Sequence, residues 1–143
     1  DTINFLGENS QLAEGWYGVF PYQGWNDTDV PGVQNALAAF EAGGYPENEQ
    51  SNTYLLTYGS IYAIKDILEN TIDRVGIDGL NGEEFFGTMK EMGTIDALGL
   101  FELDVRDGNR APQQAQIRQA QMVDGKIQFV TIEDFFQLPD TRP

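Results

Sequence analysis

Three stretches of the chain carry apolar residues at the spacing of an amphipathic helix. The pattern predicts helices over 31–42, from a cap at Ser51 or Asn52 to about Arg74, and over 81–92. The first helix opens with a proline, which suits the first helical turn. A glycine follows each of the three stretches within two residues, and glycine ends a helix at little cost. These signals set the expected helix boundaries.

The two halves of the long predicted helix differ in character. The later half carries an apolar stripe at helical spacing, formed by Ile61, Ile64, Leu68 and Val75. This stripe predicts packing on a sheet. The first half places phenol rings on one face at i, i+4 and i+8, from Tyr54, Tyr58 and Tyr62. Such rings suit a solvent-filled cleft, but the ordinary interpretation is that they pack at the edge of a core with their hydroxyls in water.

The remaining apolar runs are typical of strands. Residues 15–20 form an aromatic, β-branched run that Pro21 terminates, and a second strand is predicted over 98–105. Residues 115–122 and 126–132 predict a hairpin around Asp124-Gly125, because a two-residue Asp-Gly loop matches the twist of antiparallel strands. The first arm of this hairpin is rich in glutamine, which predicts a strand with one solvated face or a strand at a sheet edge.

The composition excludes several classes of chemistry. The 143 residues include no Cys and no His, so disulfides, thiol nucleophiles, Ser-His-Asp triads and metals ligated by Cys or His are excluded. Lys and Arg number 8 against 23 Asp and Glu, and the net charge of −15 repels phosphate backbones and anionic lipids. We therefore expect no nucleic-acid and no membrane-surface partner. Solubility is the ordinary explanation of this charge, and cation binding is the alternative.

Carboxylates are the remaining catalytic candidates. The nearest pairs in the sequence are Glu83 with Glu84 and Asp104 with Asp107. Acidic residues at a helix start favour the positive end of the helix dipole, and Asp before Gly is turn chemistry, so we predict that the protein is not an enzyme. The stretches 26–29 and 104–109 offer oxygen ligands but miss the calcium-loop pattern, and no phosphate-binding glycine loop occurs. No metal and no cofactor is predicted.

The order of the elements carries a resemblance to a known family. The residues concerned are Ala13-Glu14-Gly15-Trp16-Tyr17-Gly18-Val19, Pro21, Trp25, the helix after Pro31, Tyr54-Leu55-Leu56-Thr57-Tyr58-Gly59, Gly99-Leu100-Phe101-Glu102-Leu103-Asp104, Asp107-Gly108-Asn109-Arg110 and the glutamine-rich strand before Asp124. This succession resembles the C-terminal part of type I periplasmic solute-binding proteins, in the branched-chain amino acid-binding branch that serves ABC transporters. The likeness spans nearly the whole chain and contains no catalytic motif.

The resemblance implies an α/β fold made of two Rossmann-like lobes, each a mostly parallel sheet flanked by helices. Residues 1–20 would belong to the second lobe, 21–112 would supply first-lobe helices and a strand, and 113–143 would return to the second lobe. Hinges are expected near Phe20-Pro21 and Ala111-Pro112. The chain would then hold about the last third of such a fold, as a processed product or a piece of a longer protein.

The resemblance also implies a ligand site between the lobes. Tyr58 aligns with an aromatic residue that lines the cleft in this family, and Tyr54, one helical turn earlier, is expected beside it. Trp25 is expected either to cover the rim of the cleft or to pack against its own hinge.

The function implied is capture of a small amino acid or related carboxylate by the extracytoplasmic solute-binding component of an ABC importer. Its partners would be the ligand and the membrane permease subunits. Its location would be periplasmic or extracellular, and the protein could carry a lipid anchor. The alternative is a ligand-binding sensory domain of a receptor with the same fold. A carboxylate-based hydrolase is the third hypothesis. Exposed strand edges predict a homodimer of the fragment.

Overall fold

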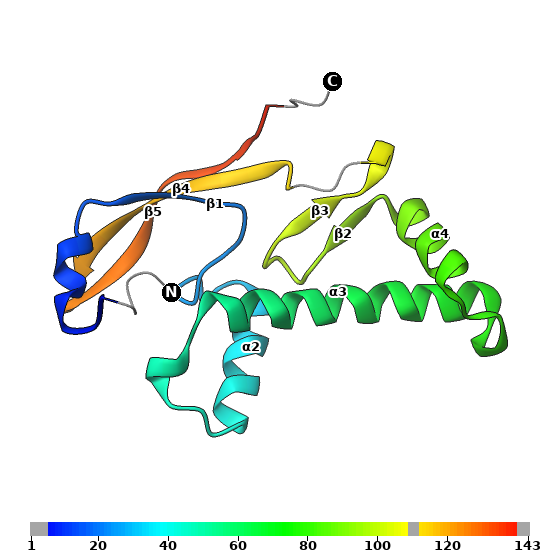
Figure 1. Cartoon of the computed structure of the whole chain (residues 1–143), viewed down its shortest axis with the longest axis horizontal. Coiled ribbons are helices and arrows are strands. Elements are labelled where there is room, and N and C mark those ends of the chain that lie inside the picture. Colours follow the sequence, from blue (N-terminus) through cyan, green and yellow to red (C-terminus); the bar gives the residue numbers. More distant parts are fainter. Residues whose placement is uncertain (1–5, 109–111, 140–143) are drawn as a thin grey trace.

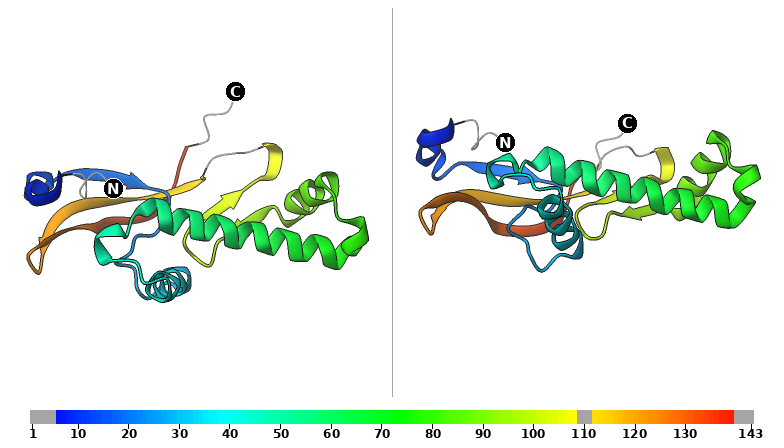
Figure 2. Two further views of the ribbon diagram at one scale, coloured as in Figure 1. Left: turned by 60° about the horizontal axis from the view of Figure 1, so that its bottom comes forward. Right: turned by 90° about the horizontal axis from the view of Figure 1, so that it is seen from below.

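The computed structural model describes residues 6–108 and 112–139 as an α+β arrangement of helices and two small sheets. The helices are α2 (Pro31–Ala42), α3 (Asn52–Val75) and α4 (Gly82–Met92), and the strands are β1 (Tyr17–Phe20), β2 (Thr94–Asp96), β3 (Glu102–Asp104), β4 (Gln114–Val123) and β5 (Lys126–Gln137). Short 3-10 turns are η1 (Gly7–Ala13), η2 (Glu47–Glu49), η3 (Ile77–Gly79) and η4 (Arg106–Gly108). The three-stranded sheet lies at one end of the molecule, and α3 runs from beside it to α4 at the other end (Figure 1, Figure 2).

The three predicted helices are confirmed, and local capping explains their boundaries. Ser51 caps α3, because its Oγ accepts a hydrogen bond from the Tyr54 amide at 3.1 Å. Gly76, with φ of 74°, ends that helix in a conformation that favours glycine. Asn81 caps α4 by accepting hydrogen bonds from the amides of Glu83 and Glu84 at 3.0 and 3.1 Å.

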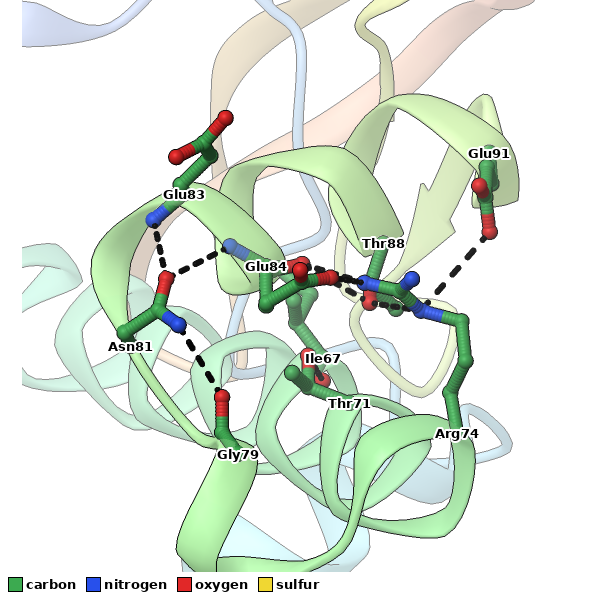
Figure 3. A network of polar contacts seen from close by, with 9 residues as sticks. All are labelled: Ile67, Thr71, Arg74, Gly79, Asn81, Glu83, Glu84, Thr88 and Glu91. Atoms are coloured by element: carbon green, nitrogen blue, oxygen red, sulfur yellow. Dashed lines mark hydrogen bonds and ion pairs between the residues drawn. The ribbon is translucent and has the colours of Figure 1, made fainter.

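A polar network joins the end of α3 to α4 (Figure 3). Arg74 Nη2 donates to the Glu84 carboxylate at 2.6 Å and to the Glu84 carbonyl at 2.9 Å, and Arg74 Nε donates to Thr88 Oγ1 at 3.2 Å. Glu91 adds a longer ionic contact of 3.9 Å. Glu84, a catalytic candidate in the sequence, therefore holds two helices together.

The hydrophobic core lies between α2, α3 and the β2–β3 hairpin. Its buried members are Val33, Ala36, Leu55, Ala63, Ile67, Ile95, Ala97 and Leu100, and residues of α4 pack against them. Gly59 lets the hairpin approach α3 closely, because a Cβ there would lie 2.8 Å from Phe101 Cε1 and 3.1 Å from Leu100 Cδ1. The buried face of α3 therefore combines small residues, Gly59 and Ala63, with the larger Leu55 and Ile67.

The prediction that the apolar stripe of α3 packs on a sheet is wrong for its first two members. Ile61 is 63% exposed and Ile64 is 50% exposed. The face that contains Gly59 and Ala63 is buried instead, since small side chains admit the β2–β3 hairpin at closer range than two isoleucines would.

The predicted hairpin is confirmed, but its glutamine-rich arm is not an edge. The sheet has the order β1-β4-β5, so β4 is the central strand. Asp124 and Gly125 form the turn with φ of 48° and 79°. Gln116 is buried because its side-chain amide is satisfied by hydrogen bonds inside the molecule, which a composition count cannot reveal.

The predicted strand over 98–105 is confirmed only at its end. Leu98 and Gly99 have φ of 55° and 77° and form a turn, so that β2 and β3 pair as a short antiparallel hairpin.

The fold class predicted from the resemblance is wrong. Every strand pair that the structure describes is antiparallel, in one sheet of three strands and one of two, and no Rossmann-like, mostly parallel sheet is formed by residues 6–108 and 112–139. The physical reason lies in the connections: β4 and β5 are joined by two residues, and α2 and α3 follow each other without an intervening strand. A parallel pair needs a much longer crossover.

The expected division of the chain into lobe segments stays a prediction. Residues 17–20 and 114–137 share one sheet, whereas 31–104 hold the three helices and the second sheet. Phe20 and Pro21 lie at the exit from β1, where one hinge is expected. Ala111, at the other expected hinge, lies outside the described residues.

Candidate functional site

A cavity of about 650 Å³ opens between the three-stranded sheet and the segments that lead into α3. One wall comes from β1 and the loop after it, a second from β4 and β5, and a third from residues 47–52. The side chains that decide its chemistry are Phe20, Trp25, Glu47, Arg118, Lys126 and Phe129. The site therefore combines segments that are far apart in the sequence.

Arg118 reaches this cavity because of its register in the central strand. Gly18 of β1 pairs with Arg118 on one side, and Thr131 of β5 pairs with it on the other. Side chains alternate along a strand, so Phe20 points to the same face as Arg118. The missing side chain of Gly18 leaves room for the Phe20 ring, since a Cβ at Gly18 would lie 2.5 Å from Phe20 Cε2. The Arg118 Cζ atom lies 5.8 Å from the centre of that ring.

The guanidinium of Arg118 is held from one side. Its side chain is 3% exposed, and Nη2 donates to Asp27 Oδ2 and to Gln23 Oε1, the latter at 3.0 Å. Nε is buried and has no hydrogen-bond partner among the described residues. Gly24 allows the loop to pass close by, because a Cβ there would lie 2.8 Å from Nη1. Burying a guanidinium that is hydrogen-bonded through Nη2 but not through Nε costs folding free energy unless a further acceptor is available.

A chain of amide hydrogen bonds fixes the loop around Arg118. Thr131 Oγ1 donates to Gln116 Oε1 at 3.0 Å, and Gln116 Nε2 donates to the Tyr22 carbonyl at 3.0 Å and to Gln23 Oε1 at 3.3 Å. The backbone amide of Gln23 in turn donates to the Leu100 carbonyl at 2.8 Å. These bonds tie the sheet to the helical layer, so that the position of Arg118 is set by both.

Aromatic rings form the apolar part of the cavity. Phe20 lies 4.9 Å from Phe129 and 5.7 Å from Tyr22, measured between ring centres. Trp25 is fixed by its Nε1, which donates to the Ser51 carbonyl at 3.0 Å just before α3. The apolar wall is therefore anchored both to the sheet and to the start of a helix.

An ion pair lies at the mouth of the cavity. Lys126 Nζ, at the start of β5, donates to Glu47 Oε1 in η2 at 2.8 Å, and both side chains are largely exposed. The hydrogen bond and charge of Lys126 lower the pKa of Glu47, and the hydrogen bond and charge of Glu47 raise the pKa of Lys126. This bridge joins the tip of the hairpin to the segment before α3.

The three residues expected at the site are placed differently. Trp25 lines the cavity. Tyr54 packs against Trp25 with 5.9 Å between ring centres and against Phe40 with 5.1 Å, so it supports the wall from behind. Tyr58 is half-buried against the hydrophobic core. The tyrosine face of α3 thus divides between support of the site and packing of the core.

Reasoning from the sequence missed Arg118, Phe20, Phe129 and Lys126. The available signal was weak: a single arginine stands among the alternating glutamine and apolar residues of the hairpin arm. Its burial follows from Gly18 opposite it in β1, and this pairing joins residues that are far apart in the chain.

Three of the carboxylates considered as catalytic or calcium-binding candidates, those of Asp27, Glu84 and Asp104, have structural partners. Asp104 accepts hydrogen bonds from Arg106 at 2.6 and 2.9 Å, and Asp27 accepts from Arg118. The side chains of Asp107 and Asn109 lie outside what the structure describes. Within the described ranges, no three acidic side chains are grouped so that they could hold a metal ion.

No helix within residues 6–108 and 112–139 is long and apolar enough to cross a membrane. Comparisons with protein-family models, with curated proteins and with solved structures found no match to this chain.

Proposed function

We propose that this protein is a binding protein that captures a small amino acid or related carboxylate, as the solute-binding component of an importer. The observation that carries the ligand class is the buried guanidinium of Arg118, which lines the cavity and has its Nε unpaired among the described residues. The role in import, with membrane permease subunits as partners and a periplasmic or extracellular location, rests on the resemblance in the order of sequence elements.

The chemistry of the cavity favours a carboxylate over a cation or a neutral polar molecule. Arginine presents donors in a planar fork that matches a carboxylate, and such charge-assisted hydrogen bonds are stronger than neutral ones. Lys126 adds a second cation at the mouth, where it is paired with Glu47. The amide side chains of Gln50 and Asn52, at the start of α3, supply polar groups on the opposite wall.

A capture role agrees with the size and lining of the cavity. Its volume of about 650 Å³ lies within the range of small-molecule pockets, and aromatic side chains share its lining with a larger number of polar and charged ones. Charged and polar groups in such a pocket orient a ligand, while aromatic rings supply most of the buried contact area.

The test is a calorimetric titration of the full chain with leucine, phenylalanine, glutamate and a set of short organic acids. We expect at least one carboxylate to bind, and its affinity to fall roughly tenfold to a hundredfold in Arg118→Ala, since the loss of a charge-assisted hydrogen bond is of that size. Arg74→Ala is the matched control, because Arg74 joins α3 to α4 at the far end of the molecule.

Unfolding of the Arg118 variant would leave this result ambiguous, so a second variant is needed. Lys126→Met changes an exposed residue and is expected to keep the fold while weakening carboxylate binding severalfold. The absence of heat with every carboxylate in the set, for a folded wild-type chain, would overturn the proposal.

A further inference from the structure

Gln116 is a buried polar residue two positions before Arg118 on the central strand β4. Each residue as a whole is 2% exposed, and their side chains share one face of the strand because side chains alternate. Among the described residues, those that line the cavity of about 650 Å³ include Arg118 and exclude Gln116, which lines a second hollow instead. Any effect of Gln116 on a ligand in the cavity must therefore pass through another side chain.

The side-chain amide of Gln116 has a fixed direction. Its Nε2 lies 3.0 Å from the Tyr22 carbonyl oxygen, which can only accept a hydrogen bond, so the nitrogen must face this group. Its Oε1 accepts a hydrogen bond from Thr131 Oγ1 at 3.0 Å. A turned amide would place two acceptors, Oε1 and the Tyr22 carbonyl, against each other inside the molecule, which costs free energy.

The direction of Gln116 sets the direction of the Gln23 side chain. Gln116 Nε2 also donates to Gln23 Oε1 at 3.3 Å, and the same oxygen accepts from Arg118 Nη2 at 3.0 Å. Both neighbours of this oxygen are donors, so a turned Gln23 amide would bring its own NH2 group against two other N–H groups. Gln23 therefore presents an oxygen to the guanidinium.

Arg118 uses both hydrogens of Nη2 for this support. One is donated to Gln23 Oε1 and the other to Asp27 Oδ2. The guanidinium is planar, so two acceptors at one nitrogen define the direction of its plane, whereas Asp27 alone would leave it free to turn about a single bond. The Nε–H group has no partner among the described residues and remains the donor for a carboxylate.

Resting on the proposed function, we infer that Gln116 is a positioning residue of the ligand site: it holds Gln23 so that Gln23 and Asp27 together orient the Arg118 guanidinium and leave its Nε–H for the ligand. The ligand does not touch Gln116. The contribution of Gln116 to affinity comes from the orientation of Arg118 before the ligand arrives, which lowers the entropy that binding costs.

The experiment replaces Gln116 with methionine in the full chain. Methionine is similar in length and has no donor, so Gln116→Met removes the support of Gln23 while it fills the same space. We titrate leucine, phenylalanine, glutamate and the short organic acids by calorimetry. For the carboxylate that binds wild type most tightly, we expect the affinity to fall roughly threefold to tenfold, the size of one neutral hydrogen bond.

Gln121→Met is the matched control for this variant. Gln121 lies on the opposite face of β4, where its Nε2 donates to Gln119 Oε1 at 3.1 Å. The same change of side chain on the same strand is therefore expected to leave the affinity at the wild-type value.

A measurement without ligand separates positioning from a loss of packing. Nitrogen-15 NMR resolves the two Nη groups of an arginine when rotation about its Cζ–Nε bond is slow, and it shows one merged signal when rotation is fast. We expect separate Arg118 signals in wild type and in Gln121→Met, and merged signals in Gln116→Met. The Arg74 signals should be the same in all three chains.

Thr131 provides a second test at an exposed position, which keeps the inference falsifiable where Gln116→Met fails to fold. Thr131→Val removes the hydroxyl that pairs with Gln116 Oε1, whereas Thr131→Ser keeps it. We expect exchange between the two Arg118 Nη signals to become severalfold faster in Thr131→Val and to stay near the wild-type rate in Thr131→Ser.

The outcomes separate this inference from the proposed function. Separate, slowly exchanging Arg118 signals in a folded Gln116→Met chain would overturn the inference, as would equal exchange rates in Thr131→Val and Thr131→Ser. Affinity that is equal in wild type and in Gln116→Met would overturn it as well, because orientation would then contribute nothing to binding. Failure of every carboxylate to bind a folded wild-type chain would overturn the proposed function, and the ligand-free spectra would still decide whether Gln116 orients Arg118.

Discussion

Arg118 is a buried cation whose position depends on its neighbours in the sheet and in the loop 22–27. Asp27 supplies the opposite charge, and Gln23 supplies a neutral acceptor at 3.0 Å. Removing one partner of such a pair leaves the other charge buried and uncompensated, and this lowers the free energy of unfolding.

Asp27→Asn is expected to destabilise the fold by roughly 1–3 kcal/mol, because it removes the charge that Arg118 faces while keeping the shape of the side chain. The guanidinium then has no competing carboxylate, so the affinity for an acid ligand should rise in the same variant. Urea unfolding measures the first effect and calorimetry the second. The exposed neighbour Asp29, changed to Asn, is the control, and equal stabilities of the two variants would contradict the pairing.

Gly18→Ala is expected to destabilise the sheet by about 1–3 kcal/mol, because overpacking displaces a ring from a filled position. The new Cβ would lie 2.5 Å from Phe20 Cε2, and Phe20 is confined by Phe129 and the Arg118 guanidinium. Gly82→Ala is the matched control, since nothing lies within 4 Å of its Cβ position. A thermal midpoint of Gly18→Ala equal to that of wild type would show that Phe20 does not occupy this place.

At the scale of elements, the helix boundaries could be predicted from local sequence signals, whereas the contacts between distant elements could not. Helix boundaries depend on caps and glycines within a few residues, so Ser51, Gly76 and Asn81 predicted them correctly. The buried face of α3 depends on the β2–β3 hairpin, and this contact could not be read from an apolar stripe. Small residues at Gly59 and Ala63 were the overlooked signal of a close approach.

The bridge between Glu47 and Lys126 gives the mouth of the cavity a defined pH dependence. Because the pKa of Glu47 is lowered from 4.5 by Lys126, its contribution is present above 4.5 and is lost as the pH falls through the lowered value. Because the pKa of Lys126 is raised from 10.5, its contribution is complete below 10.5 and is lost as the pH rises through the raised value.

A carbon-13 NMR titration of the Glu47 carboxyl group tests this bridge. We expect a midpoint below 4.5 in the wild-type chain and a return toward the ordinary value in Lys126→Met, because that variant removes both the hydrogen bond and the charge. The same midpoint in both chains would mean that the bridge does not persist in solution. Added salt should shrink the difference, since both side chains are exposed.

At the scale of the whole molecule, two apolar surfaces face solvent in the described chain. Tyr17 and Val19 on β1 are 66% and 64% exposed, and Ile61 and Ile64 on α3 are similarly open. Hydrophobic burial favours covering such surfaces, whereas the net charge of −15 opposes contact between two copies.

We expect self-association that strengthens with salt, because salt screens the repulsion between the chains. Light scattering over a range of protein and salt concentrations measures the mass. Ile64→Glu should reduce the association, and Ser60→Glu, an equal change of charge at an exposed site of the same helix, should reduce it less. A monomer mass at high protein and salt concentration would contradict the expectation.

The whole-molecule architecture was the least predictable level. The antiparallel hairpin around Asp124-Gly125 was readable, because its turn is local. The pairing of β1 with β4, which brings Gly18 beside Arg118, joins distant segments and carries no local signature. The resemblance in element order suggested parallel sheets, and the short connections of this chain contradict it. The cavity was unpredictable for the same reason, since it forms only when β1 and β4 meet.

The most direct test of the central claim, that Arg118 receives a carboxylate in the cavity, is the proton–nitrogen NMR signal of its Nε–H group. Nε is buried and has no partner among the described residues of the free protein. On addition of a carboxylate that binds in the calorimetric titration, we expect this signal to shift downfield and its exchange with water to slow, while the Arg74 signal stays in place. An Arg118 signal that does not move at a ligand concentration that saturates the calorimetric signal would contradict the account.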